Sequence, residues 1–436
     1  MAHIKIKKGL NIPLKWNPPE DIKTISSLEA ALDFTPFSPS IHPHLLVNIG
    51  DHVVVGQPII EEKGSAKRIW TSPASGMIKE IRRGAKRVLE SIIIDRDESS
   101  IHYPIPSLNP DEPLQFLHKT GLLSHLWMRP YRLPAHPQLK PRSIFVKAIE
   151  SAPFCPSAEL QLKGNEGYFQ SGLNLLSSLV SGRLHLVSHQ ASNAFKPFQK
   201  VIQHTAIGPH PISHPSLHIQ LLDPILKQTD VVWTIDTCGV VAIGRAIETA
   251  LLHPERIISL SLPEHQGYYR VIDGASMQSI LSNQLLTGRL ISGDPLTGIE
   301  TSLNGHLGFS HTVVCSIPEV DKRAPLHFFR WKSPSFTASK AYLQNKNEPV
   351  STRLHGEERA FIDPNLYDRV MPLQIPTVPL IKSILSGDFE TAEILGILEV
   401  APEDFALPTF ICPSKIEMVD IVRRGLQKMA AENLSI

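Results

Sequence analysis

Residues 230–252 read DVVWTIDTCGVVAIGRAIETALL, a short run of β-branched and aromatic residues followed by a helix-like stretch. The run DVVWT (230–234) is typical of a buried strand, and VAIGRAIETALL (241–252) has apolar residues at helical spacing. The same alternation precedes it, with strand-like SIFVKA (143–148), helical GYFQSGLNLLSSLV (167–180) and strand-like RLHLVS (183–188). Strands that alternate with helices predict a parallel sheet with crossover helices over residues 101–255.

Towards the N-terminus, residues 1–100 have the pattern of short strands separated by glycine turns. The strand-like stretches are LVNIGDHVVVG (46–56), IWTSPASGMIKEI (69–81) and VLESIIID (88–95). Short strands at regular spacing predict a small β barrel or sandwich.

Towards the C-terminus the pattern changes twice. Residues 256–328 combine strand-like RIISLS (256–261) and TVVCS (312–316) with a helix expected over 276–286, which is an α+β pattern. Residues 329–436 are mostly helical and broken by prolines, with helices expected over 377–385, 388–398 and 416–430. Gly387 and Asp388 form a pair that ends one helix and caps the next. Pro413 and Ser414 are expected to start the last helix, whose final turns would hold Arg423, Arg424 and Lys428.

Composition excludes several classes of protein. Lys and Arg number 43 and Asp and Glu 42, a net charge of +1, which argues against nucleic-acid binding. The apolar run 231–244 contains Asp236 and is too short to cross a bilayer, and the first residues lack the apolar region of a secretory signal. The four cysteines lie far apart, which indicates free thiols in a reducing compartment. The 37 prolines predict short elements joined by stiff loops.

Motifs for nucleotides and metals are missing. No GxGxxG or GxxxxGK[ST] occurs, so nucleotide binding in the usual manner is not expected. Four histidines stand in HTAIGPHPISHPSLH at positions His204, His210, His214 and His218. The spacing of four between the last three would suit a metal on one helical face, but the prolines at 209, 211 and 215 predict an extended loop. A weak metal or proton-handling site stays open as the alternative.

Two lone residues carry weaker hypotheses. Cys412 in FICPSK precedes an expected helix start, where a thiolate would be favoured, although a free thiol is the simpler interpretation. Lys63 in EEKG lies at a hairpin-like tip, where either a solvated lysine or a swinging-arm lysine could stand. No serine–histidine–aspartate order, HExxH or nucleophile elbow is visible, which favours a binding or scaffold protein over a complete active site.

Several stretches together resemble one family, the A subunit of the bacterial Na+-translocating NADH:quinone oxidoreductase. The resemblance rests on segments spread along nearly the whole chain: IKIKKGLNIP (4–13), TSPASGMIKEIRRGAKRVLESI (71–92), IGPHP (207–211), HIQLLDP (218–224), VVAIGR (240–245), YDRVMPL (367–373), SGDFETAEILGILEV (386–400) and EDFALPTFICPSK (403–415). Residues 255–330 match least well.

The resemblance implies a multidomain α/β and α+β fold related to the flavin- and NADH-binding subunit of respiratory complex I. Its domains would be a barrel-sandwich (lipoyl-like) domain at 1–100, a Rossmann-like domain without nucleotide motif at 101–255, a β-grasp domain at 256–328 and a helical domain at 329–436. In that relative a glycine-rich loop holds flavin, and a cysteine cluster holds an iron–sulfur centre. Here the loop at 122–133 lacks the glycines, the helical domain has only Cys412, and Pro408 stands where family members often have another cysteine.

The implied function is that of a peripheral, cofactor-free subunit on the cytoplasmic face of the bacterial inner membrane. It would dock on the membrane-embedded subunits of a six-subunit complex that couples NADH oxidation and ubiquinone reduction to Na+ export. FAD, FMN, riboflavin and an iron–sulfur centre would lie in other subunits, so this chain would not be catalytic alone and is assigned no catalytic, cofactor-binding or metal-binding residue. Expected ubiquinone contacts are Trp127, Met128, Arg129 and Tyr131, because aromatic rings and an arginine suit a quinone. The simpler interpretation is that these residues pack the Rossmann-like core or an interface.

Three alternatives remain. The chain could be a pure assembly scaffold without a quinone site. It could also be a lipoyl- or biotinyl-type carrier modified at Lys63, although the modification motif of those carrier domains is missing there. It could also be a standalone flavoenzyme.

Overall fold

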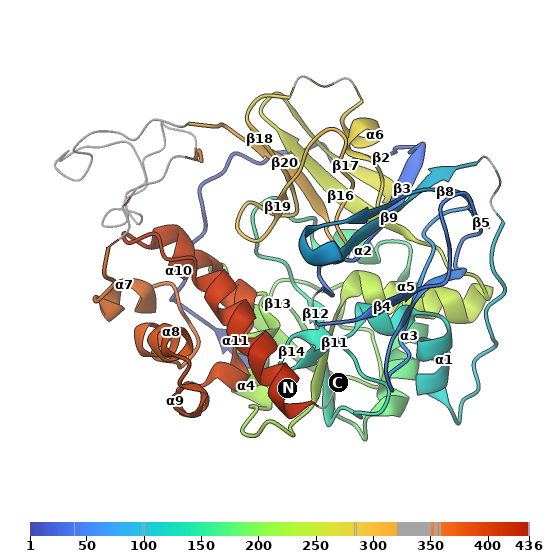
Figure 1. The fold of residues 1–436 in the computed structure, drawn as a ribbon. Coiled ribbons are helices and arrows are strands. Elements are labelled where there is room, and N and C mark those ends of the chain that lie inside the picture. The colour runs from blue at the N-terminus through green and yellow to red at the C-terminus, as the bar shows by residue number, and fades with distance from the viewer. Residues whose placement is uncertain are drawn as a thin grey trace.

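The architecture is that of a computed structural model, drawn as a ribbon in Figure 1. The structure describes the whole chain except residues 39, 98, 100, 283, 285, 321–349, 353–355, 357–358 and 435–436. Its strands form four sheets, and most helices of the C-terminal part gather on one side, drawn in red (Figure 1). The predicted multidomain mixture of α/β and α+β parts with a C-terminal helical region is confirmed.

The second domain is built on a seven-stranded sheet. Its strand order is β1 (His3–Lys5), β14 (Ile202–Ile207), β13 (Leu184–His189), β12 (Ser143–Ala148), β15 (Val232–Asp236), β10 (Trp127–Arg129) and β11 (Leu133–Pro134). The first five strands are parallel, and β10 runs antiparallel to β15. After β12 the chain adds β13 and then β14 on one side of β12, and it then crosses to the other side of β12 to form β15. The strand order therefore reverses between β12 and β15, which is a topological switch point.

Helices cover this sheet as the apolar spacing predicted. Helix α3 (Glu166–Leu179) packs closely on α5 (Thr237–Thr249), and α4 (Pro215–Leu222) packs on β12. Short helices α1 (Pro113–Lys119) and α2 (Ala158–Leu162) and the 3-10 turn η2 (Leu122–His125) complete the domain. The side chain of Asp236 caps α5 by accepting the N–H of Gly239 at 2.8 Å.

The first domain consists of two small sheets facing each other, as the strand pattern predicted. One has the order β3 (Glu29–Asp33), β9 (Leu89–Arg96), β8 (Gly76–Arg83) and β5 (His52–Val53). The other has the order β4 (Pro43–Leu45), β6 (Pro58–Glu62) and β7 (Ile69–Thr71), and the 3-10 turn η1 (Ala85–Arg87) joins β8 to β9. Phe34, Phe37 and Trp70 fill the core between the sheets with rings about 5 Å apart, at 5.3, 5.0 and 5.1 Å.

The third domain is a six-stranded sheet with one short helix. The order is β19 (Ile299–Glu300), β18 (Arg289–Ser292), β20 (Val313–Ile317), β16 (Glu255–Leu262), β17 (His265–Ile272) and β2 (Ile22–Thr24). Helix α6 covers only Met277–Leu281, so the helix expected over 276–286 was too long. Ser282 has a positive φ of 41°, which ends the helix there.

The first residues of the chain do not join the barrel sheets. Strand β1 pairs in parallel with β14, and β2 pairs in parallel with β17. The predicted domain ranges stay predictions, but the opening segment ties the second and third domains together before the barrel begins at β3.

The C-terminal domain contains helices α7 (Pro364–Asp368), α8 (Thr377–Ser386), α9 (Phe389–Ile394), α10 (Ala406–Ile411) and α11 (Met418–Asn433), with 3-10 turns η5 (Ile397–Glu399) and η6 (Pro402–Phe405). The predicted pair is confirmed, since Gly387 ends α8 with a φ of 75° and Asp388 caps α9 at Thr391. The predicted start of the last helix at Pro413 is wrong, because Glu417 precedes its first residue. Arg423 and Arg424 therefore lie in the middle of α11, where they face Asp420, and not in its final turns.

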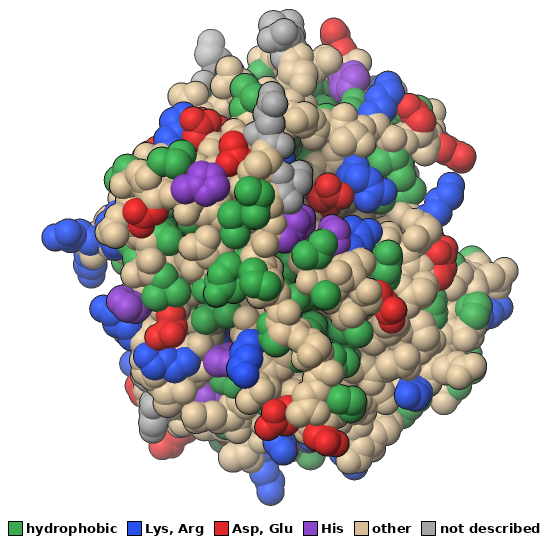
Figure 2. Space-filling view, turned by 90° about the vertical axis from the view of Figure 1, so that its right-hand side faces the viewer, with side chains coloured by type: hydrophobic (Ala, Val, Ile, Leu, Met, Phe, Trp, Pro, Cys, Tyr) green, Lys and Arg blue, Asp and Glu red, His purple; other side chains and the backbone are tan. Residues whose placement is uncertain are grey.

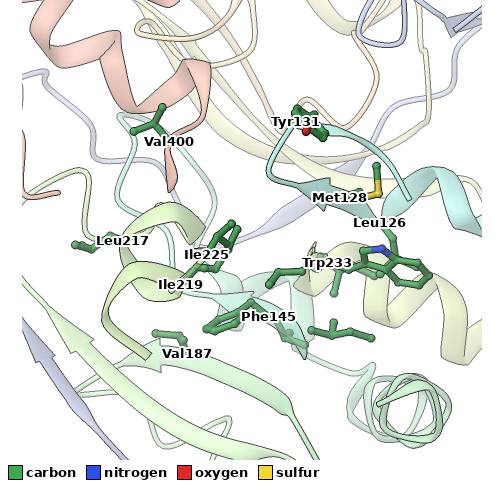
Figure 3. Close-up of a cluster of buried hydrophobic side chains, with 14 of the residues drawn as sticks. Leu126, Met128, Tyr131, Phe145, Val187, Leu217, Ile219, Ile225, Trp233 and Val400 are labelled. Atoms are coloured by element: carbon green, nitrogen blue, oxygen red, sulfur yellow. The ribbon is translucent and has the colours of Figure 1, made fainter. Parts of the chain in front are cut away.

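The second and fourth domains share one hydrophobic core. Figure 3 shows part of it, with Leu217 and Ile219 of α4, Phe145 of β12 and Val400 of the C-terminal segment in one cluster. The face that Figure 2 shows carries hydrophobic side chains grouped around its middle. Within the described residues, no helix has the length and apolar character needed to cross a membrane.

Candidate functional site: an interdomain cavity and the Trp127–Tyr131 segment

A cavity lies where the first three domains meet. Its volume is about 100 Å³. The barrel contributes residues of β3 and of the turn after β7, the second domain contributes η2 and the start of α5, and the third domain contributes the start of β16 and residues 307–310. Residues of three domains therefore form its walls.

The position of the cavity follows from the topology of the parallel sheet. Asp236 and Cys238, at the carboxyl end of β15 and in the first turn of α5, both line it. Open α/β sheets bind ligands outside the carboxyl ends of their strands near a switch point, and β15 borders that point. The cavity is thus at the edge of the sheet where this fold places ligands.

Two kinds of polar group line the cavity. Arg256 donates to Asp273 at 2.5 Å, and this ion pair forms one wall. His125 of η2 faces the same cavity, and its pKa is lowered first by burial and then by the positive charge of Arg256. His125 is therefore neutral near pH 7, and one ring nitrogen can donate to a ligand while the other accepts.

The apolar part of the lining is aromatic. Trp70 and Phe309 line the cavity, and Phe37 contacts both rings at 5.1 and 4.9 Å. Trp70 is only 1% exposed, and its indole Nε1 has no hydrogen-bond acceptor among the described residues. A buried indole N–H usually has a partner, so a ligand oxygen or a water at this wall would be stabilised.

Of the four expected quinone contacts, Trp127 is connected to the aromatic wall of this cavity through Phe37. Its ring stacks on Phe37 with centroids 5.7 Å apart and planes 11° apart. The guanidinium of Arg132 lies 3.9 Å from the centre of the same ring. Trp127 is half-buried and already contacts two neighbours, so it supports the aromatic wall through Phe37.

The other three expected contacts are buried in the second domain. Met128 and Tyr131 belong to the hydrophobic cluster of Figure 3, where they lie near Leu126. Burial raises the pKa of Tyr131. Arg129 is turned towards α4 and donates from Nη1 to Ser216 Oγ at 2.8 Å. The four side chains thus do not share one accessible surface, and their role in quinone binding stays a prediction.

The predicted loop is wrong at both ends of the histidine segment, whereas His210 and His214 do lie in a loop, residues 208–214, between β14 and α4. His204 lies in β14 with Nε2 3.0 Å from His185 Nδ1, and His218 lies on α4 and donates to Ile212 O at 2.8 Å. Pro215 starts α4 instead of preventing it, because the first helical position needs no N–H. Burial lowers the pKa of His204 and of His218 to about 4. Among the described residues, no group of three or more His, Cys, Asp or Glu is arranged to hold a metal ion.

The structure gives the positions of the two lone residues, Cys412 and Lys63. Cys412 does not precede a helix start but follows the last residue of α10, where it is buried with Sγ 3.1 Å from Tyr367 Oη. Lys63 lies in the turn between β6 and β7, exposed, with its backbone N–H on His42 O at 2.8 Å. The turn position agrees with the expected hairpin tip.

The cavity residues gave no signal in the sequence. Asp33, His125 and the pair Arg256–Asp273 come from three distant segments, and no spacing rule connects them. Only the strand-to-helix junction at Asp236 was visible in advance, as the end of the buried run 230–234.

Comparison with known proteins gives consistent results. Two family models match: the "NqrA N-terminal barrel-sandwich hybrid domain" over residues 4–97 and the "NqrA second alpha/beta domain" over residues 109–252. The A subunit of the Na(+)-translocating NADH-quinone reductase from Chlamydia caviae is 35% identical over 457 residues, which cover 98% of this chain and 97% of that relative. The protein of the same name from Tolumonas auensis is 32% identical, covering 98% of this chain and 100% of the relative.

Among solved structures, a chain from an NAD+-reducing NiFe hydrogenase in the air-oxidized state is similar over 74% of this chain and 61% of its own length. The sequence identity is 12% and the TM-score is 0.39.

Proposed function

The chain belongs to the NqrA family, the A subunits of the Na(+)-translocating NADH-quinone reductase, and from this premise we propose that it is the peripheral subunit that docks on the membrane-embedded subunits and helps to bind ubiquinone. The observation that carries the proposal is the match over 98% of this chain and 97% of the relative from Chlamydia caviae. The chain is thus part of an oxidoreductase complex. That complex would couple NADH oxidation and ubiquinone reduction to Na+ export, at the cytoplasmic face of the inner membrane.

The docking role is supported by the surface of the chain. Hydrophobic side chains are grouped in the middle of the face in Figure 2, and such groups mark protein contacts. We propose that the other subunits carry FAD, FMN, riboflavin and the iron–sulfur centre. In this chain the segment of the expected flavin loop is filled by η2 and β10, whose side chains are largely buried.

For ubiquinone we propose that the ring enters the interdomain cavity. Trp70 and Phe309 would contact the ring, His125 or the Trp70 indole N–H would donate to a carbonyl oxygen, and Trp127 would support the wall through Phe37. A cavity of about 100 Å³ is smaller than the roughly 150 Å³ that holds benzene, so side chains at its rim must move when the ring binds. The contribution of Met128, Arg129 and Tyr131 is proposed as support of this segment from behind.

Titration of the isolated full-length chain with a short-chain ubiquinone, followed by tryptophan fluorescence, tests this proposal. We expect saturable binding that weakens in Trp127→Ala and His125→Ala, with smaller changes in Arg129→Ala. Trp16→Phe is the matched control, because Trp16 packs on Tyr268 in the third domain and does not line the cavity. Equal affinity in all variants would refute the assignment of the site.

A pure scaffold is the second candidate, and the burial of Met128, Arg129 and Tyr131 favours it. It predicts no saturable quinone binding by the isolated chain. Co-purification with the membrane subunits would then persist in every cavity variant.

A further inference from the structure

Arg129 is a buried arginine with an empty hydrogen-bonding edge. Its side chain comes from the end of β10 and is only 1% exposed. Nη1 donates to Ser216 Oγ at 2.8 Å, but Nε and Nη2 have no acceptor among the described residues. An unpaired buried charge is costly, so these two donors define a place where an acceptor would be strongly stabilised.

The same edge is occupied at another buried arginine of this chain. Arg68 is 2% exposed, and its Nε and Nη2 donate to Glu62 Oε2 and Oε1, both at 2.6 Å. These two nitrogens point in the same direction and match the two oxygens of a carboxylate. Arg129 presents the identical pair of nitrogens at the same depth without a carboxylate.

The guanidinium of Arg129 lies beside the N-terminus of α4, where Nη1 makes the contact, and the Nε–Nη2 edge is on a different side of the group. Ser216, which holds Nη1, is the second residue of that eight-residue helix. The side chain of the N-cap residue His214 makes no capping bond, and its ring Nδ1 lies 2.9 Å from Asp404 Oδ1, while its backbone carbonyl accepts the N–H of Leu217 at 3.2 Å. The positive end of the helix dipole still favours an anion near this guanidinium.

The carboxylates around Arg129 are already engaged elsewhere. Asp404 accepts from the backbone of Ala401 as well as from His214, and Glu403 accepts from Arg132 Nε at 2.9 Å. Glu399 accepts from Gln220 at 3.0 Å. These three carboxylates partly balance the charge of Arg129. Burial lowers the pKa of Arg129, and the carboxylates oppose part of that shift. None of them forms a hydrogen bond with Nε or Nη2.

A second buried group near this helix end also lacks a partner. His210 is buried, its ring lies edge-on to His214 with centroids 4.9 Å apart, and its Nδ1 is 3.0 Å from Ser151 Oγ. Its Nε2 has no partner among the described residues. Two buried side chains at the junction between the second and fourth domains, Arg129 and His210, therefore have ring or guanidinium nitrogens without a hydrogen-bond partner among the described residues.

We propose that the Nε–Nη2 edge of Arg129 is a binding site for a small carboxylate monoanion. The planar two-oxygen group fits the edge as Glu62 fits Arg68. Three neighbouring carboxylates make a dianion such as phosphate unfavourable, and burial restricts the ligand to a few heavy atoms. The site is independent of the proposed quinone cavity, since Arg129 does not line it.

Thermal unfolding of the full-length chain in sodium formate or acetate, against sodium chloride at equal ionic strength, tests the site. A ligand that binds only the folded state raises the unfolding midpoint in a saturable way. We expect a saturable rise with formate, none with chloride, and loss of the rise in Arg129→Lys, which keeps the charge but not the fork. Ser216→Ala leaves the free edge intact and should weaken the response without abolishing it.

Arg68→Lys is the matched control, because it removes a buried guanidinium whose edge is already filled. Its midpoint should fall while its response to formate persists. If a variant fails to fold, the comparison of formate with chloride on the unchanged chain still tests the proposal. Equal effects of formate and chloride, or no saturable effect of formate, would show that waters occupy the edge and would overturn the proposal, as would an undiminished formate response in folded Arg129→Lys.

Discussion

Gly244 of α5 lies directly against the backbone carbonyl of Tyr168 in α3, so that a Cβ on Gly244 would stand 1.7 Å from that oxygen. Gly172 of α3 makes the reciprocal approach, with a Cβ position 2.2 Å from the carbonyl oxygen of Val240. The two helices therefore touch through their backbones over the face of the parallel sheet.

This contact predicts that Gly244→Ala is destabilising. The added methyl group must push α3 and α5 apart, which costs at least about 1–3 kcal/mol in a packed core. Gly167→Ala, in the same pair of helices, meets nothing within 4 Å and should be neutral or slightly stabilising. Urea unfolding of both variants measures the difference, and similar stabilities would contradict the close approach.

The buried pair Arg68–Glu62 gives the second prediction. Arg68 Nη1 also donates to Pro134 O at 2.7 Å, so the pair links the barrel to the second domain. Glu62→Gln leaves the arginine charge without its carboxylate and should cost roughly 3–5 kcal/mol of unfolding free energy. The double variant Arg68→Met/Glu62→Leu should cost less than the sum of Arg68→Met and Glu62→Leu, and strict additivity in this cycle would argue against the pairing.

His218 predicts a loss of stability in mild acid. Burial lowers its pKa to about 4 in the folded chain, whereas an unfolded histidine titrates near pH 6.5. Between these values the unfolded state binds the additional proton, so stability falls as pH decreases from about 6.5 to about 4. This one residue should remove about 2 kcal/mol between pH 7.5 and pH 5.

The variant His218→Gln keeps a donor for Ile212 O but cannot titrate. Its free energy of unfolding, measured in urea at both pH values, should fall less than that of the unchanged chain. Other buried histidines, including His204 and His185, contribute in the same direction and remain in both proteins. An identical pH dependence of the two would exclude His218 as a source.

The cysteines predict slow alkylation of the folded chain. Burial raises the pKa of the thiols of Cys155, Cys238 and Cys315, and the thiolate is the reactive form. Cys412 is buried against Tyr367. Iodoacetamide at pH 8 should modify none of the four within the time that modifies all of them in denaturant. Rapid labelling of Cys155, which is half-buried, would contradict its buried environment.

Local sequence patterns predicted the elements whose limits depend on neighbouring residues in the sequence. Residues 143–148 form β12 with the expected bounds, and the glycine–aspartate pair at 387–388 ends and caps helices as expected. The failures have physical causes. Pro215 was counted as a helix breaker although the first helical position tolerates it, and Cys412 was placed before a helix that begins only at Met418.

The candidate site was predicted less well because it depends on tertiary structure. Trp127 and Arg129 are two positions apart in sequence, yet one contacts Phe37 of the barrel and the other contacts Ser216 of α4. The alternation of side chains along β10 does not reveal which neighbour will cover each face. Arg256 and Asp273 meet only because β16 and β17 pair, and the sequence contains no sign of that register.

The pairing of β1 with β14 has a consequence for synthesis of the chain. His3 lies beside Thr205, 202 residues later, so the first strand to leave the ribosome has no partner until half of the chain has followed. At about 5–20 residues per second this delay is roughly 10–40 s. Strand β1 is therefore made before the other strands of this sheet but must wait for β14 at the edge, so assembly of this domain cannot simply follow the order of the chain.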